Sequence, residues 1–219
     1  MDMHRRETCP FDPEEYMKLF YMPGACSLAP HIAFREAGLP VELVQVDRSK
    51  KTSAGEDYLG INVKGAVPAV KLDDGQVLTE AAVIQQYIAD KAPAKKLAPA
   101  AGTPERYRLQ EWLNYIASEL HKGIGQLFNP AMPDEYKEAV KKGLAARQFA
   151  HVEKSLAGRD YLMGDFTIAD GYLFTVLNWT NIHKIDLSAF PNITAFMKRV
   201  SARPAVKEAM TAEGLLKAA

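Results

Sequence analysis

The chain has 219 residues, of which 47% are hydrophobic and 25% are charged, and its 27 basic residues balance 27 acidic ones. This length allows one or two domains with a sizeable core, and the neutral balance gives no electrostatic preference for nucleic acid or an anionic membrane surface. No apolar stretch approaches the roughly 18 residues of a membrane span, and the N-terminus lacks the apolar core of a signal peptide. These features predict a cytoplasmic protein with neither membrane nor nucleic-acid partners.

Two cysteines, Cys9 and Cys26, are present without a Cys-x-x-Cys pair, which argues against a disulfide framework and against a zinc site. No His-Glu-x-x-His, Walker loop or Gly-x-Gly-x-x-Gly after a strand supports metal, nucleotide or dinucleotide chemistry. Residues 1–16 are polar and contain prolines, so we expect a flexible extension in which Cys9 is solvated and has no role.

Residues 17–92 alternate between strand and helix signals. "KLFYM" reads as a strand, Ser27 is placed to cap the helix of "LAPHIAFREAG", and Gly38 suits the end of that helix. "VELVQV" is a second strand, and "SAGE", residues 53–56, has the Ser-x-x-Glu spacing of a capping box for a short helix. "AVPAVKL" and "QVLT" flank the Asp-Gly of a hairpin, and a helix follows. The order predicts an α/β domain, a small mixed sheet with helices on its faces.

Residues 93–103 are rich in proline and lack periodicity, which indicates a linker. Everything in 104–219 has a helical pattern, beginning with Thr103 as a cap and Pro104 in the first turn, so the second domain is predicted to be all-helical. Further helices are expected at about 134–157, 168–182, 190–202 and 204–217. "TIAD", which ends at Asp170, fits a capping box for the second of these stretches.

Cys26 lies between a Pro-Gly turn and the predicted start of a helix. Unpaired N–H groups and the positive end of the helix dipole favour a thiolate there, so Cys26 is a candidate working thiol. A free cysteine is also often a small buried hydrophobe, and the position alone leaves both interpretations open.

Pro68 interrupts an apolar strand pattern and should mark a bend or edge. A cis Val67-Pro68 bond would turn the Val67 backbone groups toward an extended peptide-like ligand, although trans bonds are far commoner. Glu80 opens the next helix, where the dipole alone explains a carboxylate. Alternatively, Glu80 binds a ligand ammonium while the Ala81 N–H takes a carboxylate.

On the long helix after the linker, Asn114 and His121 are seven residues apart, which places them on one face of a regular α-helix, and Lys122 adds a positive charge. A lone helical histidine is usually structural or solvated, so the pattern by itself does not choose between a structural and a catalytic role.

Five stretches, in this order along the chain, resemble the motifs of one protein family: "YMPGACSLAPHI", "NVKGAVPAV", "LTEAAVIQQYIAD", "EWLNYIASELHKG" and "GDFTIADGYLF". Residues 17–219 resemble a cytosolic glutathione S-transferase, more narrowly one of the bacterial beta class. The resemblance implies a thioredoxin-like domain followed by a helical domain, and a homodimer. Two departures are Ala81, where the family often has serine or glycine, and the 16-residue extension before Met17.

The resemblance also implies site roles. Cys26, His121 and Lys122 would act at the glutathione sulfur. The residues implied to bind glutathione are Ala25, Lys50, Val67, Pro68, Glu80, Ala81 and Asn114, with Val67 pairing with the cysteinyl backbone, Glu80 and Ala81 holding the γ-glutamyl end, and Lys50 meeting the glycine carboxylate.

We therefore expect an enzyme that adds the glutathione thiolate to small apolar electrophiles, with glutathione as co-substrate and with neither a cofactor nor a metal. A side capacity for thiol-disulfide exchange through Cys26 is part of this hypothesis, in which Cys26 is acidic and a protonated His121 assists it. The alternatives are a monothiol redox enzyme and a non-catalytic carrier of apolar compounds. Trp179, Tyr115 and Phe128 are candidates for the apolar pocket, although the helical core is the simpler place for each.

Overall fold

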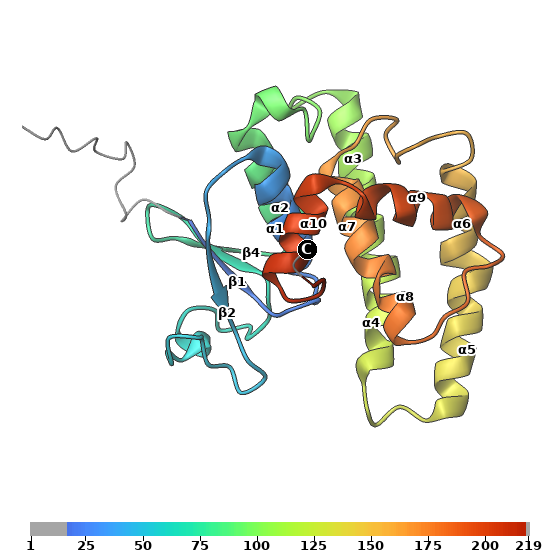
Figure 1. Cartoon of the computed structure of the whole chain (residues 1–219), viewed down its shortest axis with the longest axis horizontal. Coiled ribbons are helices and arrows are strands. Elements are labelled where there is room, and N and C mark those ends of the chain that lie inside the picture. The colour runs from blue at the N-terminus through green and yellow to red at the C-terminus, as the bar shows by residue number, and fades with distance from the viewer. Residues whose placement is uncertain (1–16, 218–219) are drawn as a thin grey trace, which may run out of the picture.

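A computed structural model describes residues 17–217 of the chain. The predicted extension, with Cys9, lies outside the described residues. In Figure 1 the strands lie on the left, most helices of the second half lie on the right, and α1, α2 and α10 lie between them. None of the helices within 17–217 is long and apolar enough to cross a membrane.

A four-stranded mixed sheet forms the first domain, with the strand order β2-β1-β3-β4. β1 pairs in parallel with β2 and antiparallel with β3, and β3 and β4 form an antiparallel hairpin whose turn contains Gly75 at a φ of 82°. The predicted mixed sheet and Asp-Gly hairpin are therefore confirmed. The strands are β1 (Lys18–Tyr21), β2 (Glu42–Gln45), β3 (Ala69–Lys71) and β4 (Val77–Thr79).

Two helices pack on this sheet, α1 (Leu28–Ala37) between the parallel strands and α2 (Ala81–Lys91) after the hairpin. α1 ends at Gly38 in the left-handed conformation, as predicted. Ser27 does precede α1, but the prediction that its side chain caps the helix is wrong. The Ser27 hydroxyl instead donates to the Met22 carbonyl and accepts from the Met22 N–H, because the intervening loop folds back on it.

The short helix expected in this region forms only as one 3₁₀ turn, and the capping box predicted at residues 53–56 is wrong. These residues form a turn in which Thr52 bonds the backbone of Glu56 and Gly55 has a φ of 85°, a left-handed value that a helix cannot accommodate. A single 3₁₀ turn, η1 (Tyr58–Gly60), follows, and the Asp57 side chain accepts the N–H of Leu59 at its start.

The second domain is helical, as predicted. Its linker contains one 3₁₀ turn, and two helices pass through π-helical turns before they end. The elements are η2 (Pro93–Lys95), α3 (Pro104–Tyr115), π-helical η3 (Ile116–His121), α4 (Lys122–Gly125), η4 (Gln126–Phe128), α5 (Asp134–Leu144), π-helical η5 (Ala145–Phe149), α6 (Ala150–Ser155), α7 (Ile168–Leu177), α8 (Trp179–Ile182), α9 (Pro191–Ser201) and α10 (Pro204–Ala212).

Helix α7 is the centre of the molecule, because every one of its residues is buried and it packs against α1, α2, α3 and α9. The predicted capping box at its start is confirmed: the Asp170 carboxylate accepts the N–H of Thr167 at 2.8 Å and that of Leu162 at 2.9 Å. The Thr103 cap of α3 is confirmed as well. Packing of α7 on α1 and α2 fuses the two domains through one core and places α7 beside the sheet domain.

Candidate functional site

A cavity of about 260 Å³ lies where the sheet domain meets η3 and α7. This is close to the lower end of the roughly 300–1,000 Å³ that small-molecule sites span. Its lining comes from both domains: Cys26, Asn62, Lys64, Ala66, Val67, Pro68, Thr79, Glu80, Ala81, Ala117, His121, Lys122 and Tyr172. Seven of the ten residues predicted for the site thus meet here: Cys26, Val67, Pro68, Glu80, Ala81, His121 and Lys122.

Cys26 is partly exposed to this cavity, and its Sγ donates to the Val67 carbonyl at 3.2 Å. Burial raises the pKa of the Cys26 thiol to about 12. The backbone N–H groups of Cys26 and Ser27 and the charge of Lys122 act in the opposite direction but do not offset it, and Glu80 adds to the rise. The expectation of an acidic Cys26 is therefore wrong, because desolvation outweighs the helix-start N–H groups.

Glu80 lies at the N-terminus of α2 with a φ of 71°, a left-handed value that is uncommon for a residue with a side chain and is often found at functional sites. Its carboxylate accepts from the ammonium of Lys64 at 2.8 Å. The N–H of Ala81, at the first position of α2, makes no hydrogen bond within residues 17–217. The site therefore presents an anionic group and a free backbone donor side by side.

The Val67-Pro68 peptide bond is cis, as the resemblance implied. It precedes β3, and the loop before it is held in place because the Ala66 carbonyl accepts from the Tyr58 hydroxyl at 2.7 Å and from Asn62 at 2.8 Å. Within the described residues the Val67 N–H makes no hydrogen bond, and its carbonyl takes only the Cys26 thiol. Both backbone groups of Val67 can therefore serve a peptide-like ligand.

His121 enters the cavity at the end of η3, and its Nδ1 lies 2.8 Å from the Tyr172 hydroxyl. Burial lowers the pKa of His121, Lys122 lowers it further, and Glu80 acts in the opposite direction. The expectation of a protonated His121 is therefore wrong, and the imidazole is neutral at neutral pH. Lys122 supplies the positive charge on this side of the cavity.

Asn114 is exposed and lies outside the cavity lining. The expectation that Asn114 and His121 share a helix face assumed a continuous α-helix, whereas the chain is π-helical from Ile116 to His121. A π turn closes i to i+5, so residues seven apart lose their alignment. Ala25 and Lys50 also lie outside the lining, although the Lys50 side chain packs beside Gly65 in the loop that leads to Val67.

The three apolar candidates do not line the cavity. Trp179 is buried, stacks edge-on against His121 with ring centres 5.1 Å apart, and donates its indole N–H to the Gly24 carbonyl at 2.8 Å. Phe128 is half-exposed and contacts Trp179, and Tyr115 faces a separate open depression beside His151.

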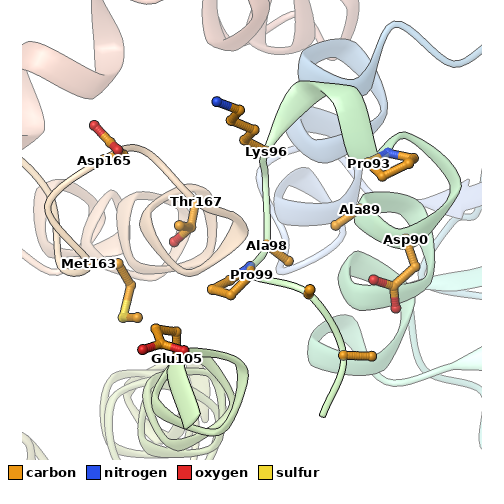
Figure 2. Close-up of a pocket in the computed structure, with 12 residues that line it drawn as sticks. Ala89, Asp90, Pro93, Lys96, Ala98, Pro99, Glu105, Met163, Asp165 and Thr167 are labelled. Carbon is orange, nitrogen blue, oxygen red and sulfur yellow. The ribbon is translucent and has the colours of Figure 1, made fainter. Parts of the chain in front are cut away.

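A larger cavity of about 550 Å³ lies between the linker, the end of α2 and the loop before α7 (Figure 2). Alanine, proline and methionine side chains form much of its wall, together with the charged side chains of Asp90, Lys96, Glu105 and Asp165. Its lining includes neither a cysteine nor a histidine. Among the described residues, no group of His, Cys, Asp or Glu side chains is arranged to hold a metal ion. The smaller cavity is therefore the candidate active site.

Several residues that line the cavity were not predicted from the sequence, and two of them, Lys64 and Tyr172, form hydrogen bonds with the predicted site residues Glu80 and His121. Lys64 falls within "NVKGAVPAV" and Tyr172 within "GDFTIADGYLF", so both were inside quoted motifs. No local signal indicates that Tyr172, on an entirely buried helix, reaches a cavity formed with the other domain.

Family models for the N-terminal and C-terminal domains of glutathione S-transferase match residues 15–90 and 115–204. The glutathione S-transferase GstA of Escherichia coli O157:H7 is 49% identical over 91% of this chain and 100% of its own length. The chain belongs to the glutathione S-transferase family.

Solved structures agree with this membership. A sphingomonad glutathione S-transferase complexed with glutathione is 48% identical, with a TM-score of 0.87 over 91% of this chain and 100% of its own. A beta-class glutathione S-transferase of Sphingomonas chungbukensis is 44% identical, with a TM-score of 0.87 and the same coverage. The chain is thus a glutathione S-transferase, an enzyme, with the thioredoxin-like and helical domains of that family and a likeness to its bacterial beta class.

Proposed function

We propose that this transferase binds glutathione in the cavity lined by Cys26 and His121 and joins its sulfur to small apolar electrophiles. The observation that carries the proposal is the meeting, in one cavity, of a carboxylate, a helix-start N–H with no partner in the described residues, and the backbone N–H and C=O of Val67, of which the C=O accepts only from the Cys26 thiol. The carboxylate and the helix-start N–H complement the charged γ-glutamyl end of glutathione. The Val67 backbone groups complement its peptide backbone.

The γ-glutamyl end is assigned to Glu80 and Ala81. The Glu80 carboxylate already binds an alkyl ammonium, that of Lys64, so a ligand ammonium can take the same place. The Ala81 N–H at the start of α2 suits the α-carboxylate, because helix N-termini favour anions. The cysteinyl unit then pairs with Val67 beside Pro68, and Lys50 reaches the glycine carboxylate. The contacts assigned to Ala25 and Asn114 stay predictions.

In the reaction, the glutathione thiol releases its proton to water, and the His121 imidazole and the Lys122 ammonium stabilise the resulting thiolate. The thiolate attacks an electrophilic carbon, a carbon–sulfur bond forms, and the leaving group departs with its electron pair. Cys26 acts as a neutral thiol that donates a hydrogen bond, since its pKa of about 12 leaves little thiolate at neutral pH. A dedicated monothiol redox enzyme would instead use the Cys26 thiolate to attack a disulfide sulfur.

Turnover tests this proposal. A chlorinated nitroaromatic and glutathione should give the thioether and chloride, while calorimetry should detect glutathione binding by itself. Binding without turnover would indicate a carrier, and reduction of glutathione mixed disulfides faster than conjugation would indicate a redox enzyme. Absence of glutathione binding would contradict the proposal.

The assembly proposed is a homodimer of subunits divided into 17–92 and 104–219 by the linker 93–103. α2 and α3 lie side by side, with Gln110 bonded to Gln86, and both expose large apolar side chains, Val83 at 45% and Tyr107 at 63%. Such a surface suits a second copy. Light scattering should give twice the 24.2 kDa chain mass at micromolar concentration, and a monomer would contradict this.

A reducing, cytoplasmic compartment suits the free thiol of Cys26.

A further inference from the structure

We infer that Tyr172 is a positioning residue that holds the His121 imidazole in the tautomer with its proton on Nε2, so that a hydrogen-bond donor faces the reacting sulfur. This inference rests on the proposed function for its catalytic consequence, whereas the tautomer itself is a property of the free protein.

The imidazole is held from two sides. Tyr172, on α7, is 2% exposed, and its ring meets the His121 ring at 85° with centres 6.0 Å apart. Trp179 meets the same imidazole at 70°, with centres 5.1 Å apart. One edge of the imidazole, the Nδ1 edge, is thereby directed at the Tyr172 hydroxyl, 2.8 Å away.

The chemistry of the two groups sets the direction of this hydrogen bond. Burial, followed by the charges of Cys26 and Glu80, raises the pKa of Tyr172, so the phenol keeps its proton. His121 is neutral and carries one ring proton, on either nitrogen. An imidazole nitrogen is a stronger base than a phenol oxygen, and a phenol is a better donor than a neutral imidazole. The favoured arrangement therefore has Tyr172 donating to Nδ1, which leaves the ring proton on Nε2.

The second ring nitrogen is the one available to a ligand. Nε2 of His121 makes no hydrogen bond within residues 17–217 and is not among the buried atoms that lack a partner, and the side chain lines the cavity. With the proton on Nε2, a thiolate in the cavity meets a donor. With the proton on Nδ1, it would meet a lone pair and be repelled. The charged groups near the imidazole, Lys122 and Glu80, act on its overall charge but bond neither ring nitrogen.

The tautomer can be measured directly, without glutathione, by ¹⁵N NMR of the histidine rings at pH 8, because protonated and unprotonated ring nitrogens differ in shift. The His121 signals are assigned by their loss in His121→Gln. Wild type should carry the proton on Nε2, and Tyr172→Phe, which keeps the ring, should shift the population toward Nδ1. The matched control is Tyr115→Phe, whose hydroxyl donates to the Gln148 carbonyl outside the cavity and should leave His121 unchanged. An Nδ1 proton in wild type, or an unchanged tautomer in Tyr172→Phe, would overturn the inference.

The consequence for the sulfur is measured as the pKa of enzyme-bound glutathione, followed by thiolate absorbance across pH. Tyr172→Phe should raise this pKa by about one unit, which matches the loss of one modest hydrogen bond to the thiolate. Tyr115→Phe should not change it, and thermal unfolding of both variants checks that they remain folded. If glutathione binds but its pKa is equal in all three proteins, the inference fails while the proposed function stands. If glutathione does not bind to wild type, the proposed function fails, and the NMR measurement still decides the tautomer.

Discussion

At the scale of single residues, the pKa of the Cys26 thiol differs between an isolated helix start, which would lower it, and the folded protein, which raises it. Its pKa is raised to about 12 by burial, so the thiolate fraction is small at neutral pH and grows about tenfold per pH unit. We expect alkylation of Cys26 to rise about tenfold per unit from pH 7 to pH 10 without a plateau, as followed by peptide mass spectrometry.

Cys26→Ser provides the control for this measurement, because any labelling that remains belongs to Cys9. A rate that levels off below pH 8 would mean that the helix-start N–H groups outweigh burial after all.

Glu80 offers a second residue-scale prediction, because its carboxylate is the anionic group of the cavity and binds an ammonium at 2.8 Å. Glu80→Gln keeps the shape and removes the charge. Since a hydrogen bond to a charged group contributes roughly 1.5–3 kcal/mol, glutathione affinity should fall by about 10- to 100-fold in calorimetry. Glu56→Gln, an exposed change outside the cavity, is the matched control, and equal affinity of both variants would remove Glu80 from the site.

At the scale of elements, α7 depends on its capping box. Thr167 is 4% exposed, and its hydroxyl and N–H both bond the Asp170 carboxylate at the start of the central helix. Thr167→Ala should lower the free energy of unfolding by about 1–2 kcal/mol in urea denaturation, the usual cost of losing a cap. Thr211→Ala, an exposed threonine on α10, should change it by less than about 0.5 kcal/mol. Equal effects of the two changes would mean that the box contributes nothing beyond an ordinary threonine.

At the scale of the whole molecule, Arg203 joins the two domains. Its guanidinium donates two hydrogen bonds to the Glu36 carboxylate of α1, at 2.6 and 2.9 Å, and a third to the Tyr161 hydroxyl, and it stacks 3.8 Å from the centre of the Phe166 ring. Lysine cannot reproduce this planar fork. Arg203→Lys should therefore lower the free energy of unfolding by about 1–3 kcal/mol. Arg159→Lys, at an exposed position, serves as the control, and a loss of similar size there would assign the effect to general surface charge.

The N-terminal stretch gives the second whole-molecule prediction. Residues 2–16 have no periodic apolar face with which to pack against the core, so their removal should leave the melting temperature and glutathione affinity nearly unchanged. A large drop in melting temperature on truncation would show that this stretch contributes to the folded protein.

The sequence by itself determined the features that depend on neighbours along the chain. Gly38 ends α1, the Asp-Gly pair makes the β3–β4 hairpin, and Thr167 with Asp170 starts α7, because turns and caps are built from backbone groups only a few residues apart. The two-domain order followed from the same periodic patterns. Seven of the ten predicted site residues line the cavity, and they were predicted from the resemblance of five ordered motifs to a family. Residue spacing alone did not predict them.

Only the tertiary structure decided the pKa values of the site residues and which residues line the cavity. The pKa of Cys26 depends on how deeply the folded chain buries it, which no local pattern encodes. Asn114 lies outside the cavity lining, on a helix that becomes π-helical after it, and Tyr172 reaches His121 because α7 packs against η3. The burial of Cys26 and the contact of Tyr172 with His121 arise between residues far apart in the sequence, so they are set by how the elements pack in the folded chain.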